Sequence, residues 1–312
     1  MRISNKITCV FFIGLLFFAF AGCEHPISSS SESNSEAPTT PTTPTTPTTP
    51  TYIGTKAPSE AKEVGDIVFN DGSATPYTSG MSITDKQKKA AIALIFYKGT
   101  ELNSGDDITT VRTLGVGLKH KSSGLAWCLD SANAHSKNIK NIQCKPQGPT
   151  GSLVFDDATA NDRNGSDNLE QIADFLTAAD GVDDDTTGDG AADRYPAFYF
   201  AKNYKDTANN LGSYSDGWYL PSTAELFQIY KNGKGTDKKF DIYAVNKALG
   251  VDMFKNAYWY WSSSQCPDSE AINYATIAYR IRSDGAWSTD KKSSNMDKRA
   301  GNTYYVCAIR EF

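Results

Sequence analysis

The feature that most constrains the fold is an alternating stretch near the C-terminus, which runs from Tyr274 to Arg282. Its odd-numbered positions read Ala, Ile, Tyr and Ile, whereas its even-numbered positions read Tyr, Thr, Ala, Arg and Arg. Side chains alternate between the two faces of a strand, so the stretch predicts a strand with buried odd positions and exposed even positions. Half-buried strands of ordinary antiparallel sheets also alternate in this way. The even row combines aromatic, polar and cationic groups without a paired acid, base or nucleophile, which favours recognition over catalysis.

The first 22 residues predict a secretion signal. Arg2 and Lys6 precede an apolar run from Val10 to Phe20, which is too short to span a bilayer as a helix. The following Ala21-Gly22-Cys23 resembles a bacterial lipoprotein cleavage box. We therefore expect lipidation at Cys23, anchoring in the outer membrane and exposure at the cell surface. An ordinary signal peptide followed by an unrelated cysteine is the alternative.

Residues 23–50 predict a stalk between the anchor and the folded part. The segment from Ser28 to Glu36 is rich in serine and acidic residues. It is followed by prolines at every third position with Thr-Thr between them: Pro38, Pro41, Pro44, Pro47 and Pro50. Polyproline II has three residues per turn, so the prolines would follow one edge of an extended helix with a reach of roughly 70 Å. A disordered linker of the same composition would also serve as a tether.

Residues 51–312 are expected to form one domain, because no further linker of this composition interrupts them. The whole chain has 31 basic and 36 acidic residues and no basic block, which argues against nucleic acid as a partner. Beyond the signal and the lipid site, the cysteines are Cys128, Cys144, Cys266 and Cys307. Four cysteines allow three pairings, of which Cys128–Cys144 is favoured because it closes a short loop.

Periodicity and capping residues predict both strands and helices. Strands are expected at 64–69, 92–97, 114–118, 125–129, 258–262, 274–282 and 304–310, with a turn at Asp284-Gly285. Thr84 is expected to cap a short polar turn, and helices are expected after Asp167, at 196–202, from Ser222 to about Tyr230, and at 238–249. The clearest local signal is the capping box formed by Ser222 and Glu225. Strands and helices do not alternate strictly, so the fold class is α+β, with antiparallel sheets and packed helices.

Three segments resemble one family of domains. The Gly217–Leu226 segment, with its Trp-Tyr-Leu-Pro and helix start, is similar to a motif of bacterial C-type lectin-like domains of the formylglycine-generating-enzyme type. The Tyr260–Ser264 segment resembles their next core strand, and the Val306–Phe312 segment resembles their closing strand. Order and spacing agree over residues 64–312. The resemblance implies a C-type lectin-like fold.

A narrower resemblance concerns the whole layout. A lipid anchor, a spacer and a terminal segment of this kind are similar to the variable proteins of diversity-generating retroelements, in particular to treponemal variable lipoproteins. In that family, adenine-directed mutagenesis rewrites the final segment of the gene, usually at asparagine codons. The resemblance implies a C-terminal variable region at about 258–312 that presents a hypervariable ligand-binding surface.

This mutagenesis limits which positions can vary. Adenine changes in an asparagine codon produce residues such as Ser, Asp, Thr, Ala, Tyr, Arg, Cys and Gly, but not Trp, Lys, Glu, Gln or Met. Trp287, Lys291, Lys292 and Met296 are therefore poor candidates for variation, although Trp287 is still expected to contact the ligand. The other predicted ligand-binding residues are Cys266, Asp268, Ser269, Tyr274, Thr276, Ala278, Arg280, Arg282, Asp284, Ser288, Ser293, Ser294 and Asp297.

The sequence thus predicts a surface-tethered, monomeric binding protein that is not an enzyme. Tyr274 and Trp287 would supply apolar area with a polar tip, and Arg280 and Arg282 would supply bidentate donors. A flat row suits a macromolecule better than a small molecule, so the expected partner is a protein or glycoprotein on another cell.

Two other classes of function stay open. Formylglycine-generating enzymes bind copper through a cysteine pair, which here could only be Cys266 and Cys307. Calcium-dependent lectins carry Gln-Pro-Asp loops, whereas this chain has Gln265-Cys266-Pro267-Asp268. The acidic loop at 183–193 contains alternating oxygens but lacks the closing glutamate of a calcium loop. His25, His120 and His135 have no zinc spacing, so we expect neither metal nor cofactor.

Overall fold

Two β-sheets organise the folded part of the chain. The computed structural model describes residues 51–104, 109–121, 124–155, 158–179, 185–186, 188–235, 238–267, 274–294 and 304–312. Within these residues, no helix is long and apolar enough to cross a membrane. The predicted signal, lipid site and stalk at 1–50 lie outside the described residues.

The five-stranded sheet has the order β2-β1-β3-β4-β9, and all its neighbours are antiparallel. Its central strand β3 has an almost continuous apolar sequence, Ala-Ile-Ala-Leu-Ile-Phe-Tyr, because both of its faces are buried. The first three predicted strands are confirmed here with shifted ends. The strands are β1 (Asp66–Phe69), β2 (Ala74–Pro76), β3 (Ala91–Gly99), β4 (Arg112–Gly117) and β9 (Ile309–Glu311).

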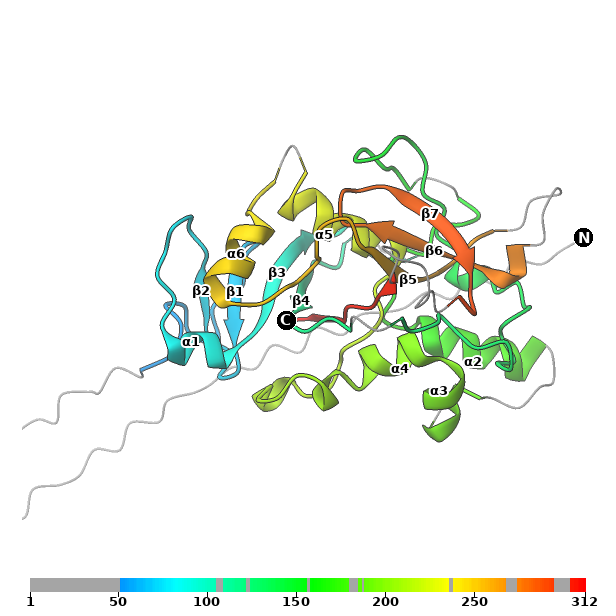
Figure 1. The fold of residues 1–312 in the computed structure, drawn as a ribbon, viewed down its shortest axis with the longest axis horizontal. Coiled ribbons are helices and arrows are strands. Elements are labelled where there is room, and N and C mark those ends of the chain that lie inside the picture. Colours follow the sequence, from blue (N-terminus) through cyan, green and yellow to red (C-terminus); the bar gives the residue numbers. More distant parts are fainter. Residues whose placement is uncertain are drawn as a thin grey trace, which may run out of the picture. The chain divides into compact units, whose positions relative to one another are not determined.

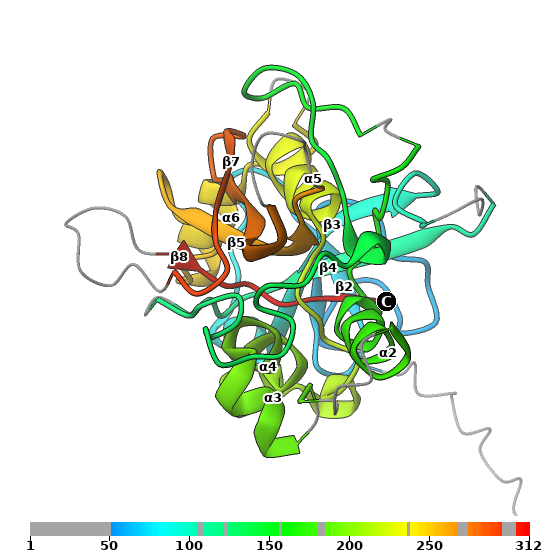
Figure 2. The ribbon, with the colours of Figure 1, turned by 90° about the vertical axis from the view of Figure 1, so that its right-hand side faces the viewer.

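The four-stranded sheet has the order β7-β6-β5-β8. Its strands are β5 (Trp259–Gln265), β6 (Ile277–Arg282), β7 (Trp287–Lys291) and β8 (Tyr304–Tyr305). β6 and β7 form a hairpin around the predicted turn at Asp284-Gly285, where Gly285 has a φ of 82°. β8 returns to pair with β5 in parallel. In Figure 2, β7 and β8 lie on the left of the molecule, away from α2.

The helix α5 (Thr223–Gly233) begins at the predicted capping box. The Ser222 hydroxyl accepts a hydrogen bond from the Glu225 amide at 3.2 Å, and the Glu225 carboxylate accepts one from the Ser222 amide at 2.8 Å. α5 contacts β3 of one sheet and both β5 and β6 of the other. It therefore couples the two sheets through one apolar layer (Figure 1).

Two of the remaining helices begin at side-chain caps. α6 (Ile242–Leu249) begins after Asp241, whose carboxylate accepts two amide hydrogen bonds, and ends at the left-handed Gly250. Thr84 caps α1 as expected, and Pro196 occupies the first turn of α4. The others are α1 (Asp85–Ala90), α2 (Asn168–Ala179), α3 (Gly188–Arg194) and α4 (Pro196–Lys202), with 3-10 turns at Lys140–Ile142, Tyr204–Asp206, Gly212–Tyr214 and Tyr274–Thr276.

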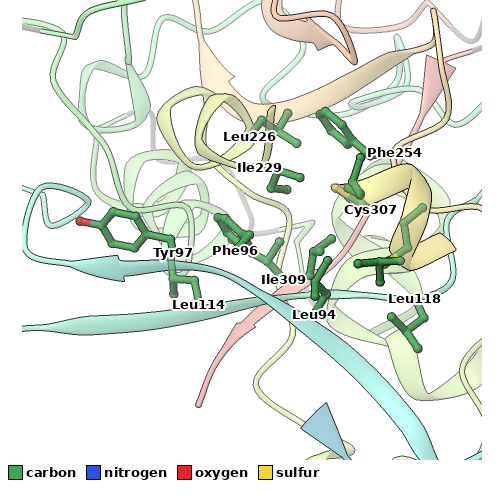
Figure 3. Packing of buried hydrophobic residues seen from close by; sticks show 14 of the residues in the cluster. Leu94, Phe96, Tyr97, Leu114, Leu118, Leu226, Ile229, Phe254, Cys307 and Ile309 are labelled. Carbon is green, nitrogen blue, oxygen red and sulfur yellow. The ribbon is translucent and has the colours of Figure 1, made fainter. Parts of the chain in front are cut away.

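Two apolar clusters fill the interior, and neighbouring residues of the same strand often belong to different clusters. Leu94 and Phe96 of β3 belong to the first cluster, with α5 and α6. Figure 3 shows Cys307 and Ile309 of the closing segment in this layer. The second cluster contains Trp261, with residues of α2, α4 and the 126–142 segment.

Several sequence predictions are wrong. Residues 125–129 contain no strand, because their backbone groups bond to the Trp261 indole and to the backbones of Lys292, Arg194 and Ala197 instead of to a neighbouring strand. Tyr274–Thr276 is a 3-10 turn, so the alternating strand begins only at Ile277. The expected closing strand at 304–310 splits into β8 and β9, which belong to different sheets. The strand β7 was not among the predicted strands, because only the turn before it was predicted.

The four cysteines in the described residues are free and buried, so the favoured Cys128–Cys144 disulfide is not formed. Cys128 belongs to the second apolar cluster and Cys144 to the first, which separates the two thiols. Burial raises the pKa of both thiols, and this keeps them protonated.

Candidate functional site

The candidate site is a patch on one face of the four-stranded sheet, where β5, β6, β7 and β8 bring residues far apart in sequence together. Arg282 pairs with Trp259 across β5 and β6, and Arg280 pairs with Ser288 across β6 and β7. Directly paired residues project from the same face of a sheet. Trp259 also pairs with Tyr304 of β8. We call Trp259, Arg280, Arg282, Asp284, Asp290 and Tyr304 the Arg280 patch.

Arg280 is held tightly at the centre of this patch. Its guanidinium lies 4.6 Å from the ring centre of Trp259 and 4.5 Å from that of Tyr304. One guanidinium nitrogen lies 3.4 Å from an oxygen of Asp290. Only 14% of the side chain is exposed, and its Nε has no partner within the described residues. The two rings and the Asp290 carboxylate therefore hold this side chain in one orientation. Cation–π contacts of this kind strengthen when water is partly excluded.

Asp290 connects the patch to the chain after β7. Its carboxylate accepts hydrogen bonds from the hydroxyl of Tyr304, from the hydroxyl of Ser294 at 3.0 Å and from the amide of Lys291 at 2.7 Å. Burial raises the pKa of Tyr304, and its hydrogen bond to Asp290 raises it further. Tyr304 therefore remains a hydrogen-bond donor at neutral pH.

Arg282 forms the more exposed half of the patch. It binds Asp284 through two hydrogen bonds of 2.8 and 2.6 Å, a bidentate geometry that only arginine provides. The hydrogen bond between the two side chains lowers the pKa of Asp284 and raises the pKa of Arg282. The Arg282 guanidinium also lies 5.3 Å from the Trp259 ring centre. Two arginines and two aspartates give the patch no net charge.

The structure corrects two of the predicted site residues. Ala278 is completely buried and Cys266 is 5% exposed, so neither can contact a ligand directly. Near Ala278, the 124–143 segment covers the face of the sheet that carries the even-numbered residues of β6. The Trp261 indole donates to the carbonyl of Leu125 in this segment at 2.9 Å. Lys292 is also completely buried there and donates to the carbonyl of Ala134 at 2.9 Å.

Trp287 is exposed but does not belong to the Arg280 patch. It pairs with Ile281, whose side chain points into the first apolar cluster, so its ring projects from the opposite face of the sheet. Its indole donates to the carbonyl of Gly148 at 3.2 Å and packs edge-on against Tyr279. The expectation of one common surface for Trp287 and both arginines is therefore wrong.

The other predicted site residues fall into two groups. Partly exposed positions are Tyr274, Thr276, Ser288, Ser293 and Ser294. Asp268, Ser269 and Asp297 lie outside the described residues. The prediction missed Trp259, Asp290 and Tyr304, which complete the cluster. Trp259 lies two residues before the buried Trp261 on the same strand, so alternation could have placed it on this face.

A network of buried hydrogen bonds supports the sheet from behind. The Glu225 carboxylate is completely buried and accepts four hydrogen bonds, from Arg112, Tyr219, Gly165 and Ser222. Burial disfavours the charged form of Arg112, but the combined attraction of Glu225, Tyr219 and Glu311 raises its pKa. This ion pair joins β4 to the start of α5.

The serine run of β5 extends this network under the patch. Ser262, Ser263 and Ser264 are completely buried, and their side chains serve as hydrogen-bonding groups in an apolar surrounding. The Ser262 hydroxyl donates to the Tyr279 carbonyl at 2.9 Å, and that of Ser264 accepts from the Thr223 amide at 3.0 Å. β5 is thus tied to both β6 and α5 by fixed hydrogen bonds.

The residues of the two alternative functions are used structurally. The side chain of Gln265 is buried and accepts from the Ile139 amide at 3.1 Å while donating to the Lys137 carbonyl at 2.8 Å. It is therefore not available as a calcium ligand. Burial raises the pKa of the Cys307 thiol, which opposes thiolate formation.

The acidic loop at 183–193 is described only in part. Asp185 accepts hydrogen bonds from the Asn133 amide and the Tyr195 hydroxyl. Asp183 and Asp184 lie outside the described residues. No cluster of three or more acidic, histidine or cysteine side chains suited to a metal occurs in the described part of the chain.

Comparisons with known proteins give little further information. No protein-family model matches the chain, and no curated protein matches it. A solved structure described as a fimbrial protein from Bacteroides ovatus ATCC 8483 is similar, with 17% sequence identity and a TM-score of 0.46. The match covers 80% of this chain and 49% of the fimbrial protein, so this chain spans about half of that protein's length. A likeness at this level establishes neither a shared fold nor a shared function.

Proposed function

We propose that this chain is a lipid-anchored surface protein that binds a macromolecular ligand through the Arg280 patch on a C-type lectin-like scaffold. The observation that carries the proposal is the position of Arg280, whose side chain is 14% exposed, between the partly exposed Trp259 and the buried Tyr304. The reverse face of this sheet lies in the core. Arginine and aromatic residues dominate the energetics of protein interfaces. A surface of this kind suits adhesion or recognition.

The fixed geometry of the patch favours binding. Asp290 and the two aromatic rings hold the Arg280 side chain in place before a ligand arrives. A side chain that is already ordered loses less conformational entropy on binding, so more of its contact energy appears as affinity. Because the charges balance, the patch suits a mixed polar and apolar protein or glycoprotein surface better than a strongly anionic polymer.

The proposal includes sequence variation at exposed positions of this region, as in the variable proteins of diversity-generating retroelements. Arg282, Asp284, Ser288 and Ser294 are partly exposed and are reachable from asparagine codons by adenine changes. Adenine changes in an asparagine codon do not produce tryptophan or lysine. The tryptophan and lysine side chains that support the sheet would therefore stay unchanged. Sequencing the neighbouring DNA for a reverse transcriptase gene and a near-copy of the last segment that differs at adenines tests this part.

Neither alternative function gains support from the geometry. The thiol of Cys266 lies 3.3 Å from the Tyr279 hydroxyl, whereas Cys307 belongs to the first apolar cluster, and burial disfavours its thiolate. A calcium lectin would need the side chain of Gln265 as a ligand. Its oxygen already accepts from the Ile139 amide, and its nitrogen donates to the Lys137 carbonyl. Binding of glycans that a chelator abolishes would instead favour the lectin.

The direct test measures binding of the full chain to a panel of intact bacterial and animal cells. Trp259→Ala and Arg280→Ser are expected to weaken binding at least about tenfold, because each removes part of an interface centre. Lys238→Ser, on the exposed surface before α6, is the matched control and should bind as the unchanged chain does. Equal binding by all variants would contradict the proposal, provided that their thermal melts agree.

A further inference from the structure

The two sheets differ in how their edges are covered. Three of the four edges end against a bridging segment of the same chain, which protects their backbone groups. These bridges are Lys56 with Ala74 of β2, Tyr219 with Ile309 of β9, and Lys121 with Val306 just after β8. The fourth edge, β7, pairs with β6 alone among the described residues, and none of its five residues is buried.

The register shows which backbone groups of β7 point outward. The Lys292 amide donates to the Thr276 carbonyl at 2.8 Å, and the Arg282 amide donates to the Ala286 carbonyl at 2.7 Å. Both bonds lie on the β6 side, so the even-numbered residues of this strand bond to β6. The odd-numbered residues therefore direct their amides and carbonyls away from the sheet. These residues are Trp287, Thr289 and Lys291.

The open part of this edge is short and well defined. Lys291 is already satisfied, because its amide donates to Asp290 at 2.7 Å and its carbonyl accepts from the Ser294 amide at 2.9 Å. The Thr289 carbonyl receives only a long contact of 3.4 Å from the Ser288 hydroxyl. The amide and carbonyl of Trp287 and the amide of Thr289 have no partner in the described part of the chain.

Apolar surface lies next to these open backbone groups. The Trp287 side chain is 37% exposed, and its indole is fixed by the Gly148 carbonyl. Gly148 belongs to a hairpin in which Gln147 pairs with Val154, and Val154 is 52% exposed. The edge therefore offers main-chain hydrogen bonds beside a rigid aromatic ring, which is the combination used when a peptide adds to a sheet.

We propose that the free edge of β7 binds an extended segment of a partner protein, which adds to the sheet as a further strand and places an apolar side chain against Trp287. The proposal rests on the proposed function and assigns the ligand of the same sheet to one class, extended protein segments. A second copy of this chain is disfavoured as the occupant. Among the described residues of this edge, Trp287 and Thr289 alone are open, which suits one short segment, whereas a stable protein interface buries about 1,200–2,000 Å².

The test uses the full chain in detergent micelles and a displayed library of random linear peptides. Enriched peptides are expected to carry alternating apolar residues and to bind Thr289→Pro at least about tenfold more weakly, since proline lacks the outward amide and its ring blocks the added strand. Thr289→Val keeps the amide and is the matched control, with affinity expected within about twofold. Circular dichroism and thermal melts report whether each variant folds.

A second measurement does not depend on the proline variant. Bound peptide is expected to slow amide hydrogen exchange at Trp287 and Thr289 at least about tenfold in the unchanged chain, and less at Ser288, whose amide already bonds to β6. No enriched peptide, or binding without protection of these amides, would overturn the edge proposal. Peptides that lose affinity with Arg280→Ser but not with Thr289→Pro would leave the Arg280 patch in place and remove the edge. Self-association that Thr289→Pro abolishes would replace the partner segment with a second copy.

Discussion

The buried serine run of β5 and the Arg280 patch belong to the same sheet but differ in how their polar groups are paired. Ser262, Ser263 and Ser264 are completely buried and bonded to fixed backbone and side-chain partners. Arg282 and Asp284 bond to each other in contact with water, with side chains 37% and 39% exposed. A buried polar group that loses its partner costs far more than an exposed one. Stability and recognition are therefore carried by neighbouring but separable sets of residues.

The largest effect is expected from Glu225→Ala, which breaks the buried ion pair with Arg112 and the capping box of α5. Removing one partner of such a pair leaves an uncompensated buried charge and costs about 3–5 kcal/mol. Urea unfolding of the variant measures the change. The control is Lys238→Met, which removes an exposed pair with Asp241 and should cost less than about 1 kcal/mol. Similar losses in both variants would break the distinction between the two regions.

The next prediction concerns the limit of the variable surface. Ala278→Tyr places a large ring at a completely buried position and is expected to destabilise the fold by about 1–3 kcal/mol through overpacking. Ser288→Tyr makes the same change at a partly exposed position and is expected to change stability by less than about 0.5 kcal/mol. Thermal denaturation compares the two. Equal tolerance would mean that Ala278 belongs to the recognition surface after all.

Lys292, which is completely buried, provides a pH-dependent test of the boundary between the buried residues and the recognition surface. Burial lowers its pKa from 10.5 to about 8 in the fold, so between these values the unfolded chain binds more protons than the folded chain. Relative to Lys292→Met, the stability of the unchanged chain is therefore expected to rise by roughly 1.5 kcal/mol between pH 8 and pH 9.5. The comparison with this variant is needed because the buried thiols lower the stability of both chains over the same pH range. Urea unfolding of both chains at both pH values measures this rise, and an equal pH dependence in the two chains would contradict the assignment.

The smallest effect on stability is expected from Arg282→Ser. The pair with Asp284 is more than one-third exposed, so its loss should change the unfolding free energy by less than about 0.5 kcal/mol. Binding to cells should nevertheless weaken several-fold, because the variant loses a bidentate donor next to Trp259. A thermal melt paired with the cell-binding measurement separates the two effects. A large loss of stability would place Arg282 with the supporting network.

Local sequence signals predicted most helices and strands correctly. The capping box at Ser222 and Glu225 and the left-handed Gly250 each act within a few residues, so the local sequence determines them. The 125–129 segment was predicted wrongly because its partners are distant. It lies across the sheet, where Leu125 meets Trp261, and its local alternation does not reveal this contact.

The candidate site was predicted less completely, for the same physical reason. Alternation along one strand predicted the faces of Arg280 and Arg282, but it could not show that the face is covered at Ala278. Asp290 and Tyr304 join the patch only because β7 and β8 return to opposite sides of the β5–β6 pair. Pairing between strands far apart in sequence, rather than any single motif, assembles the cluster.

The parallel pairing of β5 with β8 has a consequence for how this protein can evolve. Between the end of β5 and Tyr304 the chain makes an excursion that contains the β6–β7 hairpin, and both end points are buried in the interior. A change in length outside the paired strands of this excursion starts and finishes at anchored positions, so it need not propagate into the five-stranded sheet. Related chains can then differ in the size of this excursion as well as in its composition, while the entry and exit points stay in place.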